Sequence, residues 1–129
     1  MLYMAQTYFR VQSGDRDVND LLDPGCQFSH PWSGGGRSQV GVSVCDSIDD
    51  LALYLASHLG CGIPVREGWV IVEVEADLIP GARPVDPEFE TLVRPTAIVS
   101  VRPVDAEFLA LIAEMDAFLD TFTDPSLEV

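Results

Sequence analysis

The segment WVIVEVEA, at residues 69–76, constrains the fold of this chain more than any other stretch. Valine occupies positions 70, 72 and 74, and glutamate occupies positions 73 and 75. Successive side chains of a β-strand point to opposite faces of its sheet, so a period of two predicts a strand with one apolar face and one more polar face. This segment is therefore the strongest strand predicted in the chain.

Three other segments have the aromatic and β-branched character of strands. They are TYFRVQ at residues 7–12, VGVSVC at 40–45 and TAIVSVRPV at 96–104. One or two helical turns are expected at residues 17–25, which end in Pro24 and Gly25, and a glycine-rich loop is expected at 30–39.

Two segments carry apolar residues at helical spacing. The first is expected to begin at Asp46 or Ser47, either of which can cap a helix, and Gly60 is placed to end it. The second is expected from Asp105 to about Phe122. Its apolar stripe, for which packing is favoured over ligand binding, consists of Phe108, Leu111, Ile112, Met115, Phe118, Leu119 and Phe122.

Strands interleaved with only a few helices favour an α+β domain with small mixed or antiparallel sheets. The helices are too few for a doubly wound sheet. One domain, residues 1–129, is expected, because a chain of this length can bury one core. The core is expected at about 7–122, with a frayed tail at 123–129.

Negative charge dominates the composition. The chain has 21 acidic residues against seven basic ones, all of them arginine, and a formal net charge of −14. Such a charge repels nucleic-acid phosphates and anionic lipids, so neither nucleic acid nor membrane is expected as a partner. It can attract a basic protein, and it also keeps an apolar chain soluble.

Apolar runs, cysteines and histidines further limit the class of protein that the sequence can represent. No apolar run approaches the ~20 residues of a membrane span, and the first residues lack the features of a signal peptide, so a cytoplasmic protein is expected. The cysteines, Cys26, Cys45 and Cys61, include no Cys-x-x-Cys pair, and the two histidines have no ligand spacing. Neither a disulfide framework nor a metal site is therefore predicted.

Two carboxylates stand one residue apart in the segment PEFETLVRP, at residues 87–95. Residues two apart on an extended segment point to the same side, so Glu88 and Glu90 can face one cleft. Two interpretations are open: the glutamates belong to a solvated loop, or they hold a positive charge during a reaction. Glu90 is expected to be exposed enough that its truncation has little effect on folding.

Three segments, taken in order, carry a family resemblance. The first predicted strand holds Arg10, and the segment GVSVC, with Ser43, runs into a helix that holds Tyr54. The EFE turn, with Glu90, then precedes the last predicted strand. This order, over about residues 7–104, resembles the mono-ADP-ribosyltransferase family in the broad sense that includes bacterial toxins and the catalytic domains of poly-ADP-ribose polymerases.

The resemblance implies that NAD is the co-substrate and that its nicotinamide–ribose bond is cleaved. Positive charge develops on the ribose in such a transition state, as in glycoside cleavage, and a fixed carboxylate stabilises it. The resemblance gives this role to Glu90, proton acceptance from the incoming nucleophile to Glu88, and the positioning of Glu90 to Ser43. A Glu-x-Glu turn is associated in this family with arginine acceptors, so a protein target, modified on arginine, is expected.

The same resemblance implies residues that bind NAD and an ADP-ribosyltransferase-like fold around them. Arg10 supplies donors to a ribose or phosphate, and Val11 follows it where the family usually has a small residue. Tyr54 packs near the nicotinamide, and Ser43, at the position of the family's Ser or Tyr, is also expected to bind NAD. His30, before the glycine-rich loop, is a further candidate for substrate contact.

Each of these residues also has a plain structural interpretation. Arg10 can pair with a surface carboxylate, Ser43 can bond to backbone in the core, and Tyr54 can be a half-buried packing residue. The alternative function is an acidic, non-catalytic binding or inhibitor protein that covers a basic surface of a partner protein. The target, the oligomeric state and the choice between transfer and hydrolysis stay open.

Overall fold

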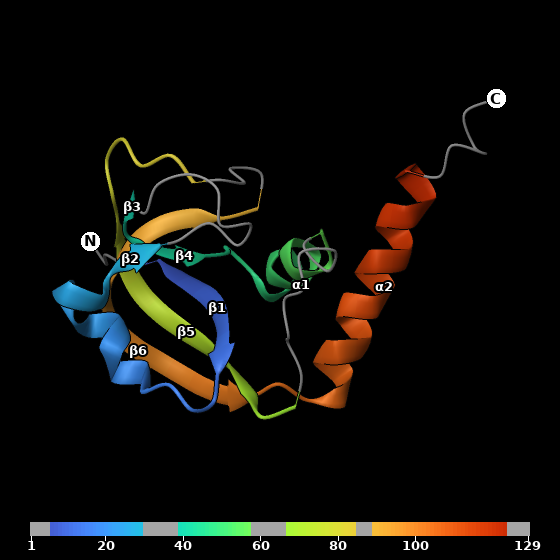
Figure 1. The fold of residues 1–129 in the computed structure, drawn as a ribbon, viewed down its shortest axis with the longest axis horizontal. Helices are drawn as coiled ribbons and strands as arrows, with labels where there is room; N and C mark the ends of the chain where they lie inside the picture. The colour runs from blue at the N-terminus through green and yellow to red at the C-terminus, as the bar shows by residue number, and fades with distance from the viewer. Residues whose placement is uncertain (1–5, 30–38, 58–66, 85–88, 124–129) are drawn as a thin grey trace, which may run out of the picture.

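Four strands pair in the order β1-β5-β6-β4 to form an antiparallel sheet (Figure 1). They are β1 (Thr7–Ser13), β4 (Val42–Val44), β5 (Trp69–Leu78) and β6 (Thr91–Pro103). The structure, a computed structural model, describes residues 6–29, 39–57, 67–84 and 89–123. The sheet and two helices make an α+β fold, which confirms the predicted fold class at this level.

The alternating segment 69–76 lies in β5, which is a central strand of the sheet. Val72 and Val74 are fully buried on one face, and Val70 packs against the same cluster. Ile71 is buried in a second cluster on the opposite face. Apolar packing therefore covers both sides of β5, and this holds the strands around it in place.

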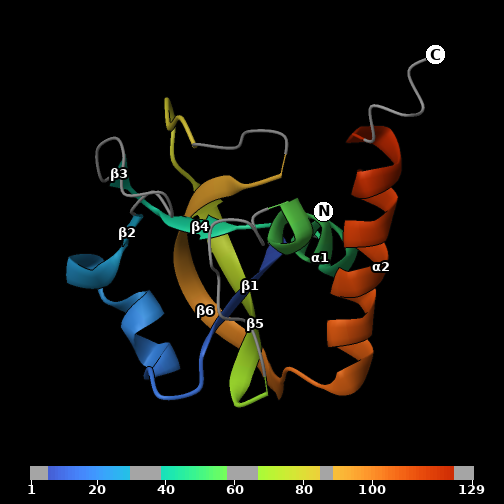
Figure 2. The same cartoon turned by 45° about the vertical axis from the view of Figure 1, so that its right-hand side comes forward.

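Both α-helices lie on one side of the sheet, and two short 3-10 helices lie on the other (Figures 1 and 2). They are η1 (Val18–Leu22), η2 (Pro24–Cys26), α1 (Ile48–Ser57) and α2 (Ala106–Thr123). The predicted cap at Ser47 is confirmed, because the backbone N–H of Asp50 donates to its Oγ at 3.0 Å. Asp105 caps α2 in the same way, through the N–H of Phe108 at 2.9 Å.

The sheet bends until its two edges meet. β6 pairs with β5 over most of its length and with β4 at its start, where Ser43 lies opposite Leu92. One residue after β4, Cys45 exchanges two backbone hydrogen bonds of 2.8 Å with Phe9 of β1. This closure places Arg10, the next residue of β1, beside the strand that carries Ser43.

Two predicted strand boundaries were wrong. The segment 40–45 is divided into β3 (Gln39–Val40), which pairs with β2 (Phe28–Ser29), and β4. Gly41 separates them with a φ of 117°, a conformation that side-chain-bearing residues rarely adopt. The last strand begins at Thr91 rather than 96, because Pro95 lies where the β5–β6 register shifts and such an irregularity tolerates a missing N–H.

The last helix was predicted with the right extent, and most of its apolar stripe packs as expected, with Leu111, Met115 and Leu119 against the core cluster. Phe108 and Ile112 are buried in the cluster that α1 and the sheet share. Phe118, which was placed in the same stripe, is 55% exposed. Among the stripe residues whose side chains the structure describes, only Phe118 was therefore predicted wrongly. None of the helices among the described residues is long and apolar enough to cross a membrane.

Candidate functional site

Glu90 is buried, with only 7% of its surface exposed, so the expectation of an exposed side chain was wrong. The cause is the early start of β6. Leu92 lies opposite Ser43 and Thr91 lies opposite Val44, so the same register continued by one residue places Glu90 across from Cys45. The pairing of β4 with β6 therefore draws this carboxylate out of solvent.

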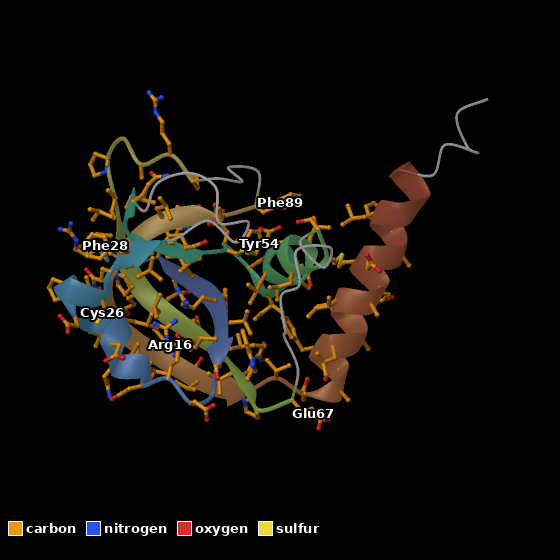
Figure 3. The ribbon with its side chains drawn as sticks, in the orientation of Figure 1. Arg16, Cys26, Phe28, Tyr54, Glu67 and Phe89 are labelled. Carbon is orange, nitrogen blue, oxygen red and sulfur yellow. The ribbon has the colours of Figure 1, made fainter. Side chains whose placement is uncertain are left out.

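Two hydroxyl groups hold the Glu90 carboxylate. Ser43 Oγ, from β4, donates a hydrogen bond to Oε2 of Glu90. The hydroxyl of Tyr54, from α1, donates to the same oxygen at 3.4 Å. Tyr54 is itself buried, and Figure 3 shows it at α1, near Phe89, the residue before Glu90. Donors from a strand and a helix therefore converge on one carboxylate, as a buried charge requires.

Arg10 faces a small cavity of about 50 Å³ that Ser43 and Tyr54 also line. The side chain is half-buried as a whole, but its Nε is enclosed and has no hydrogen-bond partner among the described residues. Burial lowers the pKa of Arg10 to about 10, and the charge of Arg16 acts in the same direction. Arg10 is still a cation at neutral pH, so this enclosed donor favours an acceptor or anion in the cavity.

Cys45 lines the same cavity, and the sequence analysis did not connect it to the site. Cys45 lies two residues after Ser43 on an extended segment, so both side chains point to the same face. This spacing could have identified Cys45 as a neighbour of the site. The thiol is 1% exposed, and burial, followed by the charges of Asp50, Glu90 and Asp46, raises its pKa to about 12. Cys45 therefore stays a neutral thiol at physiological pH and is not a nucleophile.

The predicted site residues differ in how the structure places them. Arg10, Ser43, Tyr54 and Glu90 come together from β1, β4, α1 and the start of β6. Val11 also lines the cavity, but it is buried in the core cluster and acts as a packing residue there. Several residues named from the sequence lie outside the described residues: His30, Gly60, Cys61 and Glu88.

Metal ligands do not gather anywhere in the part of the chain that the structure describes: no group of three or more His, Cys, Asp or Glu side chains could hold an ion there. Comparisons with protein-family models, with curated proteins and with solved structures found no match to this chain. The chemistry of the site therefore has to be argued from its own residues.

Proposed function

We propose that this protein cleaves the nicotinamide–ribose bond of NAD, either as a mono-ADP-ribosyltransferase that modifies a protein or as an NAD glycohydrolase. The observation that carries the proposal is the buried Glu90 carboxylate, held by Ser43 and Tyr54. The cavity lined by Ser43, Tyr54 and Arg10 adjoins it. These are the residues on which the sequence resembles the mono-ADP-ribosyltransferases, and an ADP-ribosyltransferase-like fold is part of the proposal.

Glu90 supplies the negative charge that the reaction needs. Departure of nicotinamide leaves positive charge on C1 and the ring oxygen of the ribose, as in glycoside cleavage. A carboxylate stabilises that charge best when it is fixed in advance and shielded from water. Glu90 meets both conditions, because two hydroxyl donors fix its Oε2 and only 7% of the residue is exposed.

Arg10 binds the anionic part of NAD. Its guanidinium is a rigid fork of donors suited to phosphate oxygens and ribose hydroxyls. The cavity beside it, about 50 Å³, compares with the ~30 Å³ that one water occupies in the liquid. A single oxygen-bearing group therefore enters this cavity, and the rest of NAD lies outside it.

The acceptor is a protein with an accessible arginine. This part of the proposal rests on the Glu-x-Glu spacing of Glu88 and Glu90, in which the first carboxylate accepts the proton of the incoming nucleophile. In the absence of a protein acceptor, water takes the same place and the reaction is hydrolysis.

The test compares nicotinamide release by wild type, Glu90→Gln and Glu73→Gln, each incubated with NAD and a cell lysate. Glu73 is a matched control, because its carboxylate also accepts a hydrogen bond from a serine, Ser100, but in an exposed setting on the sheet. Glu90→Gln is expected to lower the rate by about 10²–10³, the usual cost of one transition-state contact, and Glu73→Gln to leave it unchanged.

Two results contradict the proposal. One is the absence of nicotinamide release from wild type that circular dichroism shows to be folded. The other is release by Glu90→Gln at the wild-type rate, which would exclude Glu90 from the reaction. Transfer and hydrolysis are separated in the same samples by following incorporation of labelled ADP-ribose into lysate proteins.

A further inference from the structure

A groove of about 430 Å³ lies beside the N-terminal half of α2, next to the cap residue Asp105 and the end of β6. Its floor is apolar and is formed by Ile48, Ile71, Phe108 and Leu111. Its rim is charged and is formed by Arg102, Asp105, Glu107 and Glu114. Sites for small ligands and peptide side chains commonly have this volume and this combination of an apolar floor and few polar groups.

One face of α2 builds one wall of the groove. Glu107, Ala110, Leu111 and Glu114 are spaced three, four and seven residues apart, which puts them on the same face of the helix. The two glutamates thus stand at the ends of this face, with a small and an aliphatic residue between them. Both glutamates and Ala110 are exposed, so the wall is open to a partner.

The rim has an excess of negative charge. Three carboxylates stand against the single guanidinium of Arg102. The N-terminal end of a helix attracts carboxylates, and Asp105 caps α2, so the helix itself accounts for Asp105 and Glu107. It does not account for Glu114, which lies two turns further along. The rim and the net charge of −14 are both complementary to a cationic partner.

We propose that this groove binds a short basic segment of a partner protein, in which aliphatic side chains are flanked by arginine or lysine. The aliphatic side chains cover the floor at Phe108 and Leu111, and the flanking cations face Glu107 and Glu114. These two glutamates are seven helical residues apart, about 10 Å along the axis. A peptide in the polyproline II conformation rises about 3.1 Å per residue and returns to the same side every three residues, so two cations with two aliphatic residues between them match the wall.

This inference concerns a surface that contains none of the residues of the Glu90 site. It does not depend on NAD cleavage, and Glu90→Gln is expected to bind such a segment as wild type does. Peptide binding in the groove is possible whether or not the protein cleaves NAD, and NAD cleavage is possible without peptide binding. The two proposals therefore fail separately.

The experiment measures fluorescence anisotropy of a labelled peptide with the core Arg-Leu-Leu-Arg, titrated with the protein of residues 1–129. Two further peptides, Glu-Leu-Leu-Glu and Arg-Ser-Ser-Arg, remove the cations and the aliphatic groups in turn. The protein variants are Ala110→Arg, which places bulk and positive charge in the groove, and Ala113→Arg, which adds the same side chain to α2 outside it. Both alanines are exposed, so both variants are expected to fold.

Wild type is expected to bind Arg-Leu-Leu-Arg at least about tenfold more tightly than either altered peptide, and the binding is expected to weaken with salt. Relative to wild type, Ala110→Arg is expected to weaken the binding of Arg-Leu-Leu-Arg about tenfold, and Ala113→Arg less than about twofold. Equal loss in both variants would mean that only the general negative charge binds the peptide, which overturns the proposal.

Two other results also overturn it. The first is no measurable binding of Arg-Leu-Leu-Arg to wild type at low salt. The second is occupation of the groove by a second copy of the chain. Analytical ultracentrifugation of wild type and Ala110→Arg tests this by measuring the oligomeric state of each. A wild-type dimer that becomes a monomer only in Ala110→Arg would show that a second copy of the chain covers the groove.

Discussion

The hydrogen bond between Ser43 and Glu90 gives the sharpest test of the site, because it joins residues 47 positions apart. Ser43→Ala removes one of the two hydroxyl donors to a carboxylate that is 7% exposed. Glu90→Gln keeps the shape of the side chain and an acceptor oxygen but removes the charge. Combining the two changes in a double-mutant cycle isolates the charged part of the interaction.

The expected magnitudes follow from this geometry. A hydrogen bond to a charged group contributes about 1.5–3 kcal/mol to stability, and one between neutral groups about 0.5–1.5 kcal/mol. Ser43 is half-buried, which favours the lower part of each range. Ser43→Ala is therefore expected to lower the free energy of unfolding by about 2 kcal/mol in wild type and by about 1 kcal/mol in Glu90→Gln. The coupling energy is the difference, about 1 kcal/mol.

Urea unfolding followed by circular dichroism measures these values for the four proteins of the cycle. A second cycle on Ser100 and Glu73 is the control, because Ser100 Oγ donates to Glu73 Oε1 at 3.3 Å in an exposed setting. Its coupling energy is expected to be below about 0.3 kcal/mol. A coupling energy for Ser43 and Glu90 as small as the control value would refute the buried, charged hydrogen bond.

Two further predictions concern the surroundings of the site. Gly41→Ala is expected to lower the free energy of unfolding by about 2–3 kcal/mol in urea titrations, mainly because φ is 117°, and also because a Cβ would lie 3.1 Å from Leu92 Cβ and would displace Ile79 Cδ1 from 2.6 Å. Gly81→Ala, with φ of 76° and no atom within 4 Å, is the control at about 1 kcal/mol, and equal losses would contradict the clash. Burial raises the pKa of Cys45 to about 12, so iodoacetamide at about pH 8 is expected to leave Cys45 unmodified in folded protein while the exposed Cys26 reacts. Peptide mass spectrometry checks this, and labelling of Cys45 at the rate seen in urea would contradict it.

Local patterns were enough to predict most of the elements. Alternation in the segment 69–76 identified β5, and Ser47 identified the start of α1, since strand period and helix capping are properties of the adjacent chain. The boundaries of β4 and β6 could not be predicted in this way. The last predicted strand began only after Pro95, but the register shift of β5 against β6 allows β6 to pass through this proline.

The sequence named four side chains that the structure brings together, but it did not predict their environment. Arg10, Ser43, Tyr54 and Glu90 were named from a family resemblance in the order of three segments, and their role in a reaction stays a prediction. The burial of Glu90 could not be predicted, because it results from pairing β4 with β6, which joins segments about 50 residues apart. The same long-range closure brings Cys45 to the cavity.

The burial of Glu90 raises the question of whether its negative charge serves the stability of the fold or a chemical reaction. Among the described residues Glu90 is the only buried acidic side chain in a chain with 21 acidic residues. Removing a carboxylate from water costs several kcal/mol, and a glutamine of the same shape would accept from Ser43 and Tyr54 without that cost. Folding therefore does not need the charge. Glu90→Gln is expected to change the free energy of unfolding by less than about 1 kcal/mol, because the cost of the buried charge offsets its stronger hydrogen bonds, while nicotinamide release falls by about 10²–10³. A loss of stability well above that value would mean that the carboxylate serves the fold, and it would remove the main reason for assigning Glu90 a chemical role.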